Sequence, residues 1–354
     1  MNLHAFTRRE TAPSTDISQL PRARDPGLAR EFHRWPLPGY VWPALERRYH
    51  SIFCSEPQLR IHEGLTPLIE AWVSRQDGRI ATLVLFERHG RCARVLNEVF
   101  DLSADELRDF ADAVFTHHRE LQAVTVRAAF FAPKPGRYLC LSAAMSEDYQ
   151  LTLPRSADDW VASLSSQTRE KFRAHLRRAQ RRQPGFRFRT IASSAIEEAQ
   201  VRRVIDFNRA RMQAKRRRFG MSEADERHLC RMMRERGLLS VIEIDGEIRA
   251  GLLCTLAGDD IYMHVIAHDP AFDELRLGFL CCALTIQEAI GRRLRRFHFL
   301  WGYYDYKTKL GGERKELSRV LLLRGPVAML TQPKLLASQL MAALRAWLRR
   351  RRHG

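Results

Sequence analysis

The sequence predicts a mixed α/β fold with a central sheet and crossover helices, and two adjoining patterns carry this prediction. Three apolar, β-rich segments follow one another through short turns such as Asp245-Gly246, which predicts an antiparallel meander: Leu238–Ile244, Ile248–Leu256 and Ile261–Ala267. A helix with an apolar side, from Gly278 to Gly291, and a strand over 296–300 come next. A strand–helix–strand unit of this length favours two parallel strands joined by a right-handed crossover.

Length and charge bound the class of protein. The chain of 354 residues is long enough for two domains. Lys and Arg number 59 against 41 Asp and Glu, so the formal net charge is +18. Such an excess predicts attraction to a polyanion, which is a nucleic acid, an anionic membrane surface or a phosphate-rich cofactor. Arginine supplies most of the excess, and its guanidinium suits bidentate contact with phosphate.

Cysteine and histidine usage gives no sign of a disulfide framework or a metal centre. The seven cysteines include no CxxC pair and have no regular spacing. Because His117 and His118 are adjacent on a helix, their side chains point to different sides, and a solvated helix end is the preferred interpretation. The N-terminal segment lacks the apolar run of a signal peptide, and no stretch reaches the ~18 apolar residues of a membrane span. We therefore expect a cytoplasmic protein, with a peripheral position on the inner face of the membrane as the alternative.

Composition divides the chain into four parts. Ser103 and Glu106 of the second part have the spacing of a helix capping box, and the segment 151–154 marks a seam before the third part. The aromatic residues of the first part are expected to dock it onto the second, with a partner-binding peptide as the alternative. The parts are an irregular N-terminal arm, an α/β half, a second α/β unit and a C-terminal helix, at residues 1–45, 46–150, 151–325 and 326–354.

Two predicted helices of the third part are strongly basic. Arg169, Arg173 and Arg177 are spaced i, i+4 and i+8, so they share one face of the first helix. The second helix, over 197–218, ends in the basic run Lys215–Arg218. Two interpretations stay open for these faces, contact with phosphate or an anionic surface and simple solvation.

The C-terminal part predicts a basic amphipathic helix. Leu336, Leu340 and Leu344 lie along one face, and Arg345 and Arg349–Arg352 crowd its end. Such a helix is typical of a membrane-surface or partner-binding element. The alternative is a terminal helix docked on the protein body, with its arginines complementing the helix dipole.

The order of elements over residues 150–325 resembles the GNAT acyltransferase fold. More narrowly, it resembles the BioF2-like, FemAB-related acetyltransferases (the CelD-like type) found in exopolysaccharide and cell-envelope gene sets. FemAB relatives contain two GNAT-like halves, so the resemblance implies that 46–150 is a degenerate first half. The segments that carry the resemblance are the Ser/Arg-rich helix over 163–179, Phe207–Arg211, the hairpin around Asp245-Gly246, the helix start at Gly278, and the Gly-x-x-x-Tyr-Lys pattern of Gly302, Tyr306 and Lys307.

The resemblance implies a donor site for acetyl-CoA or another acyl-CoA, without a metal. In GNAT proteins the pantetheine arm of coenzyme A pairs with one of two splayed strands, which places Val265 and Ile266 beside it. The pyrophosphate would contact the start of the following helix, where free N–H groups bind phosphate; these residues are Arg276, Leu277, Gly278 and Phe279. Leu280 departs from the family's loop pattern, so another acyl carrier stays open as the donor.

Acyl transfer from a thioester to an amine needs a neutral nucleophile, a polarised carbonyl and a proton for the leaving thiolate. Tyr306 is the first candidate acid and Tyr304 the second, while His264 is the candidate base. In the structural alternative the tyrosines pack the corner, and His264 is a satisfied core residue. Cys281 and Cys282 lie inside the helix and are expected to fill the core, in preference to a covalent acyl-enzyme role. The expected acceptor contacts are Arg169, Arg173, Trp301 and Lys307.

Three functions follow from these patterns. The leading hypothesis is a GNAT-type N-acyltransferase that uses acyl-CoA and a small-molecule or glycan-precursor amine, in polysaccharide or cell-envelope metabolism. The second is a FemAB-like aminoacyl-tRNA-dependent transferase, whose basic helices would contact RNA phosphate. The third is a non-catalytic GNAT scaffold that binds an anionic membrane, through the C-terminal helix, or a nucleic acid.

Overall fold

The computed structural model describes residues 28–353. Its first half contains β1 (Leu28–Arg34), α1 (Val41–Tyr49), α2 (Glu56–His62), β2 (Ile69–Gln76), β3 (Arg79–His89), β4 (Cys92–Val95), β5 (Phe100–Asp101), α3 (Ala104–His117) and β6 (Ala123–Phe130). Helices α1 and α3 pack on the strands around a core rich in large side chains such as Trp72, Phe86 and Phe110. The predicted capping box of Ser103 and Glu106 is confirmed at the start of α3.

The second half begins with a long strand. Its elements are β7 (Leu139–Thr152), α4 (Ala157–Ser163), α5 (Ser166–Arg182), β8 (Arg187–Ala192), α6 (Glu198–Ala214), α7 (Glu223–Arg236), β9 (Gly237–Ile244), β10 (Glu247–Ala257), β11 (Asp260–His268), α8 (Leu277–Gly291), β12 (Arg296–His298), α9 (Asp305–Lys309), β13 (Glu313–Leu323), α10 (Pro326–Thr331) and α11 (Pro333–His353). The strand expected over 296–300 thus ends at His298, and the corner after it contains the short helix α9. The helix expected over 197–218 ends at Ala214.

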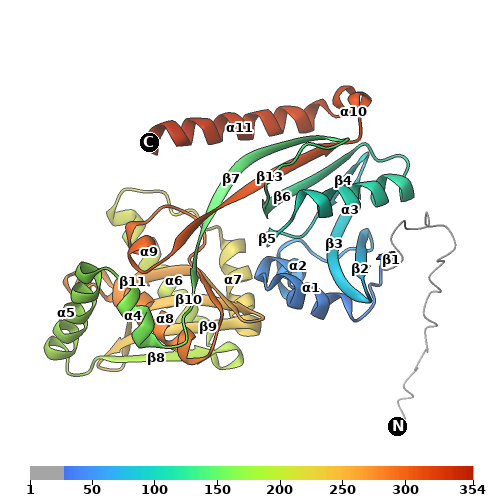
Figure 1. Cartoon of the computed structure of the whole chain (residues 1–354). Helices are drawn as coiled ribbons and strands as arrows, with labels where there is room; N and C mark the ends of the chain where they lie inside the picture. Colours follow the sequence, from blue (N-terminus) through green and yellow to red (C-terminus); the bar gives the residue numbers. More distant parts are fainter. Residues whose placement is uncertain (1–27, 354) are drawn as a thin grey trace, which may run out of the picture.

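The described strands form one mixed sheet of 13 strands, with helices on both of its faces (Figure 1). The order is β1-β2-β3-β4-β6-β13-β7-β12-β11-β10-β9-β8, and β5 pairs with β6. The predicted α/β class, a mixed sheet with crossover helices, is confirmed.

Two long strands carry the sheet from one half into the other. β13 lies between β6 and β7 and pairs antiparallel with both. The last residues of β7, Gln150–Thr152, pair with β12. The sheet is therefore continuous through 151–152, where the sequence suggested a seam. β13, which the sequence placed in the second unit, lies between β6 of the first half and β7 of the second (Figure 1).

The meander and the crossover unit have the predicted topology. β9, β10 and β11 are antiparallel neighbours, and β11 is parallel to β12, with α8 connecting the two. Alternate side chains of the strands face opposite cores. Leu239, Val241 and Val265 pack with residues of α6 and α7, whereas Leu238, Ile242 and Met263 pack with residues of α4, α5 and α8.

The irregular N-terminal arm expected over 1–45 is corrected in part. Residues 1–27 lie outside the described residues. Leu28–Arg34 is an edge strand that pairs antiparallel with β2, so the backbone groups on its inner side are satisfied by the sheet. Trp35, Tyr40 and Trp42 pack against the first core, as expected for docking aromatics.

The C-terminal helix α11 lies along the outside of β7 and β13 (Figure 1). The side-chain amide of Gln339 donates to the backbone carbonyls of Leu141 and Arg319, each over 3.0 Å. The helix is therefore docked on the sheet through one face. Among the described residues, no helix combines the length and the apolar character needed to cross a membrane.

Candidate active site at the fork between β11 and β12

β11 and β12 run side by side for three residue pairs and then part. The pairs join Asp260–Tyr262 to Arg296–His298. In the ladder with β10, the partner of Leu253 is Val265 and that of Cys254 is Met263, so His264 is the extra residue of a β-bulge. Among the described strands, β11 beyond Tyr262 therefore has a neighbour on its β10 side alone. We call this opening, between Met263–His268 and the chain after His298, the strand fork.

The start of α8 faces the strand fork and is not capped by a side chain. Arg276, in the left-handed conformation, precedes the helix. The first N–H groups of an α-helix have no partner within the helix, which leaves the amides of Leu277, Gly278 and Phe279 for a ligand. The amide of Arg276 instead donates to the carbonyl of Asp273 over 3.1 Å. The amide of Arg276, one of the four expected phosphate contacts, is therefore already bonded. Its exposed side chain remains available to contact a phosphate.

Several positive charges surround the start of α8. The ring of His175, on α5, lies 6.2 Å from the ring of Phe279. Burial lowers the pKa of His175, and so do the neighbouring positive charges of Arg178, Arg276 and Lys171. Free helix amides together with clustered cations form a favourable place for an anionic group.

Lys307 holds the corner after β12. Its side chain is buried, and its ammonium donates to the carbonyls of Leu300 (2.8 Å) and Trp301 (2.7 Å). Burial lowers the pKa of Lys307 to about 8. With two of its three donors bound to the backbone, Lys307 supports the corner and has little capacity left to orient an acceptor, which was the role expected from the sequence.

Tyr306 lies half-buried on the corner, next to the second core. Its ring centroid is 6.5 Å from that of Phe299 and 6.1 Å from that of Tyr304. Burial raises the pKa of Tyr306, while the positive charge of Arg211 acts in the opposite direction. The hydroxyl therefore stays protonated at neutral pH and can donate a hydrogen bond. Tyr304 is more exposed, and its ring lies beneath the ammonium of Lys307.

Arg211, from α6, is a candidate that the sequence reasoning passed over. Its charge acts on Tyr306, and its Nε is buried without a hydrogen-bond partner among the described residues. A buried donor without a partner is uncommon, and together with the influence of its charge on Tyr306 it makes Arg211 a candidate for contact with a bound group. The sequence segment Phe207–Arg211 pointed to this helix but gave no reason to prefer Arg211 over Arg209.

His264 lies at the bulge of β11 and is neutral at physiological pH. Burial lowers its pKa to about 4, and its Nε2 lies 2.7 Å from the hydroxyl oxygen of Thr255. An imidazole with so low a pKa is a weak base. The position suits the structural alternative, a neutral hydrogen-bonding side chain at the fork, better than the candidate base.

A cavity of about 570 Å³ adjoins this region from the first half of the chain. The Phe53 ring connects the two, because it lies 5.3 Å from the Trp301 ring and 6.5 Å from the His264 ring. We call it the inter-half cavity, and its lining is Phe53, Gln58, Leu59, His62, Glu63, Leu96, Glu98, Arg127, Ala128, Met145, Ser146 and Trp301. Of the four acceptor contacts expected from the sequence, Trp301 is in this lining.

Charged residues of the first half meet in the inter-half cavity. Arg127 pairs with Glu98 and reaches toward Glu63. Burial raises the pKa of Glu98, although the charge of Arg127 opposes this. Glu98 and Arg127 are 29 positions apart, on the loop after β4 and on β6, so no local spacing marks them.

The remaining predicted contacts lie elsewhere. The guanidinium of Arg169 donates to the carbonyl of Ala162 over 3.1 Å, and Arg173 is exposed on α5. Neither lines the inter-half cavity. Cys281 and Cys282 are fully buried in α8, and burial raises the pKa of both thiols, that of Cys281 to about 12. Protonated, enclosed thiols act as core residues, as expected.

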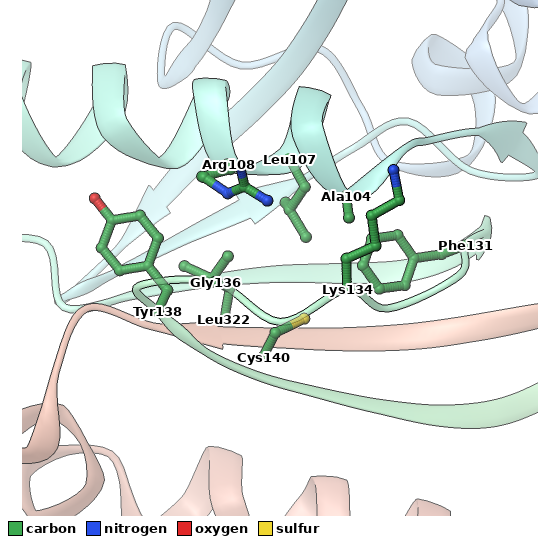
Figure 2. A pocket seen from close by; sticks show the side chains of 9 residues that line it. All are labelled: Ala104, Leu107, Arg108, Phe131, Lys134, Gly136, Tyr138, Cys140 and Leu322. Carbon is green, nitrogen blue, oxygen red and sulfur yellow. The ribbon is translucent and has the colours of Figure 1, made fainter.

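Two further features of the first half stand apart from this region. A solvated helix end was expected here, but His118 is buried. It follows the last residue of α3 in a non-helical conformation, and its Nε2 lies 3.0 Å from the Glu70 carboxylate. The ligand atoms of Glu70, His117 and His118 lie within 4.8 Å of one another, but Arg88 also pairs with Glu70. A hollow beneath α3 has a volume of about 20 Å³, room for a water molecule (Figure 2).

The strand fork lies within the segment of the chain that matches a known protein family. Residues 166–308 match the family model described as "Acetyltransferase (GNAT) domain". No curated protein is similar enough in sequence to count as a relative. Among solved structures, FemX is 9% identical, with 82% of this chain and 97% of FemX covered and a TM-score of 0.60. A conserved protein of unknown function from Bacteroides thetaiotaomicron VPI-5482 is 13% identical, with 80% and 96% covered and a TM-score of 0.51. Residues 166–308 of this chain are therefore similar to the GNAT acetyltransferase domain, and the chain shares the fold of FemX over most of its length.

Proposed function

We propose that the chain is an N-acyltransferase that moves an acyl group, most simply acetyl, from coenzyme A to an amine held in the inter-half cavity. One observation carries the proposal: β11 and β12 part at a bulge, directly beside the uncapped start of α8. In this arrangement the extended pantetheine arm of coenzyme A can pair with an open strand edge, and its phosphates can accept hydrogen bonds from free helix amides.

The donor would lie in the strand fork. Its pantetheine arm would pair with the open edge of β11 at Val265 and Ile266. The pyrophosphate would accept hydrogen bonds from the amides of Leu277, Gly278 and Phe279, with the side chain of Arg276 adding a positive charge. Acyl-CoA is a cytoplasmic metabolite, so the proposal includes a cytoplasmic location for the reaction.

The chemistry needs one bond made and one broken. The amine nitrogen bonds to the acyl carbon, the carbon–sulfur bond breaks, and the electron pair leaves on sulfur as thiolate. The protonated hydroxyl of Tyr306 is suited to donate to that sulfur. The proton lost by the amine passes to a carboxylate, for which Glu98 is suited because burial raises its pKa toward neutrality.

The acceptor class follows from the lining of the inter-half cavity. A volume of about 570 Å³ suits a small molecule. Glu63 and Glu98 offer carboxylate oxygens to an amine, which would share them with the arginines that already pair with them, Arg94 and Arg127. Outside this lining, the buried Nε of Arg211 suits an anionic group of the donor or acceptor. We therefore propose a small amine, such as an amino sugar of a glycan precursor, and link the enzyme to polysaccharide or cell-envelope metabolism.

A thiol-release assay with acetyl-CoA and a panel of small amines tests the proposal. Wild-type protein is expected to release free thiol with at least one amine. Tyr306→Phe, which removes the donor and keeps the ring, is expected to lower kcat by about 100-fold. Tyr303→Phe is the matched control, because Tyr303 is 64% exposed on the same corner, and it is expected to retain activity. Equal loss in both variants, or full activity of Tyr306→Phe, would remove Tyr306 from the mechanism.

A second candidate, aminoacyl-tRNA-dependent transfer, is favoured by the exposed arginines of α5. Arg173, Arg177 and Arg178 are exposed on the helix that packs beside α8. RNA binding through phosphate contacts weakens steeply with salt. Transfer RNA bound in this way, with no thiol release from acyl-CoA, would support this candidate. A protein that neither releases thiol nor binds acyl-CoA or tRNA would instead be a non-catalytic scaffold.

A further inference from the structure

Exposed apolar side chains gather at the C-terminal end of the described chain. Outside this segment, the large hydrophobic residues exposed in the described part are Leu68, Leu139 and three aromatic residues of the corner after β12. Soluble monomers rarely expose contiguous apolar surface without a purpose. The gathered residues belong to α10 and α11: Val327, Met329, Leu330, Leu340, Met341, Leu344, Trp347 and Leu348.

The apolar surface of helix α11 is wider than the part that packs on the sheet. Its inner face is docked, with Leu335 and Leu336 against the cluster formed by β4, β6 and β13 and with Gln339 and Ala346 buried. Leu340, Leu344, Trp347 and Leu348 lie beside this docked face, on an adjoining side of the helix that stays exposed. We call these four residues the outer face. A helix that only covers the sheet needs one apolar face, so the outer face requires a separate explanation.

The charge of the segment indicates which kind of surface covers the outer face. From Pro326 to His353 the sequence contains six Lys and Arg and no Asp or Glu. The guanidinium of Arg351 lies 3.8 Å from the centroid of the Trp347 ring, so a positive charge contacts the outer face itself. Cations beside Trp and Leu on an exposed helix suit the boundary between anionic lipid headgroups and acyl chains.

A second copy of this chain is a poor occupant for the same surface. An interface related by two-fold symmetry places the same patch of both copies face to face. Here it would bring together two segments that each carry six basic residues and no acidic one, on chains of net charge +18. Anionic lipid neutralises those charges instead of opposing them.

We propose that the outer face of α11 lies on an anionic membrane surface and inserts its apolar side chains among the lipids. The proposal concerns where the protein works and does not depend on the proposed acyl transfer. α11 lies along β7 and β13 (Figure 1), the strands that join the two halves, so the bound protein would hold a fixed orientation toward the membrane.

Vesicle co-sedimentation of the full chain tests this proposal. Wild-type protein is expected to sediment with vesicles of phosphatidylcholine and phosphatidylglycerol and to stay in solution with phosphatidylcholine alone. The double variant Leu344→Glu, Trp347→Glu is expected to lose binding by about tenfold or more. Leu68→Glu is the matched control, because Leu68 is a 59% exposed leucine on the first half, and it is expected to bind as wild type does.

The results of this experiment distinguish an anionic membrane from a second copy of the chain as the partner of the outer face. Both variants are first compared with wild type by thermal unfolding, since substitutions at exposed positions are expected to leave the fold intact. Absence of binding by wild type, or equal binding by the double variant, overturns the proposal. A wild-type dimer in light scattering that the double variant converts to a monomer, without vesicle binding, also overturns it and makes a second copy the occupant.

Discussion

Tyr306 and Lys307 are neighbours in the sequence, yet the fold uses them differently. The ammonium of Lys307 is bound to two backbone carbonyls, so its substitution would disturb the corner itself. The Tyr306 hydroxyl is held protonated by burial. The pattern Gly302, Tyr306, Lys307 could be recognised in the sequence, but the division of roles could not, because it depends on which side chain turns into the core.

At Glu98 we predict an acid limb in the pH profile of the reaction. Burial raises the pKa of this carboxyl, and it must be ionised to accept the amine proton. The kcat/KM for the amine should therefore rise with pH as Glu98 ionises, and Glu98→Gln should lower activity and remove that limb. The assay should use a weakly basic amine, because such an amine stays neutral over the pH range in which Glu98 ionises and does not add a limb of its own to the profile. The same acid limb in Glu98→Gln would exclude Glu98 as the base.

Among the elements, the hairpin and the crossover unit follow from local chemistry. Asp245 and Gly246 both have positive φ, 54° and 83°, as a two-residue hairpin turn requires. The apolar side of α8 follows from its periodicity. The bulge at His264 could not be foreseen, because it is a mismatch between two strands and leaves no mark in either sequence.

Gly251 of β10 sets how closely α6 approaches the sheet, and α6 carries Arg211. A Cβ at this position would lie 2.2 Å from Cγ2 of Val204, a short side chain with little room to move. Gly251→Ala is therefore expected to destabilise the fold by about 1–3 kcal/mol in urea unfolding. Gly291→Ala, on α8, meets nothing within 4 Å and is expected to be neutral or slightly stabilising. An unchanged stability of Gly251→Ala would mean that α6 packs less closely than described.

At the scale of the whole molecule, β7 and β13 join the two halves into one continuous sheet, because β13 pairs with β6 and β7 pairs with β12. Strand pairing such as Leu323 with Ala123 joins residues too distant in sequence for any local pattern to predict. The inter-half cavity has the same origin, since Phe53 meets Trp301 only after the sheet is assembled. The sequence therefore indicated the parting strands and the start of α8, but of the residues in the inter-half cavity it indicated Trp301 alone.

His298 joins β7, β12 and β11 through a buried charge cluster, which makes this central part of the sheet sensitive to pH. Its Nδ1 lies 2.6 Å from Asp148 of β7, and its Nε2 lies 3.3 Å from Asp260 of β11. Burial alone would lower the pKa of His298, but the hydrogen bonds to Asp148 and Asp260 outweigh it, and the pKa is raised above its ordinary 6.5. The folded chain thus binds more protons than the unfolded chain between these two pKa values.

The stability that His298 contributes should be complete below its ordinary pKa and should be lost as pH rises through the raised value. We therefore expect the free energy of unfolding of wild type, relative to His298→Gln, to fall over that interval. Urea titrations at several pH values measure this difference. A difference that is constant with pH would show that His298 is neutral in the folded protein.

The central claim is that the strand fork and the start of α8 bind an acyl-CoA, and calorimetric titration with acetyl-CoA tests it most directly. Gly278 is buried at the start of α8, where a Cβ would lie 3.1 Å from Nδ1 of His268, so Gly278→Trp should block the site. Gly291→Trp places the same side chain in open space at the other end of the helix. We predict saturable binding by wild type and by Gly291→Trp, and none by Gly278→Trp. Absence of binding by wild type, or undiminished binding by Gly278→Trp, would contradict the claim.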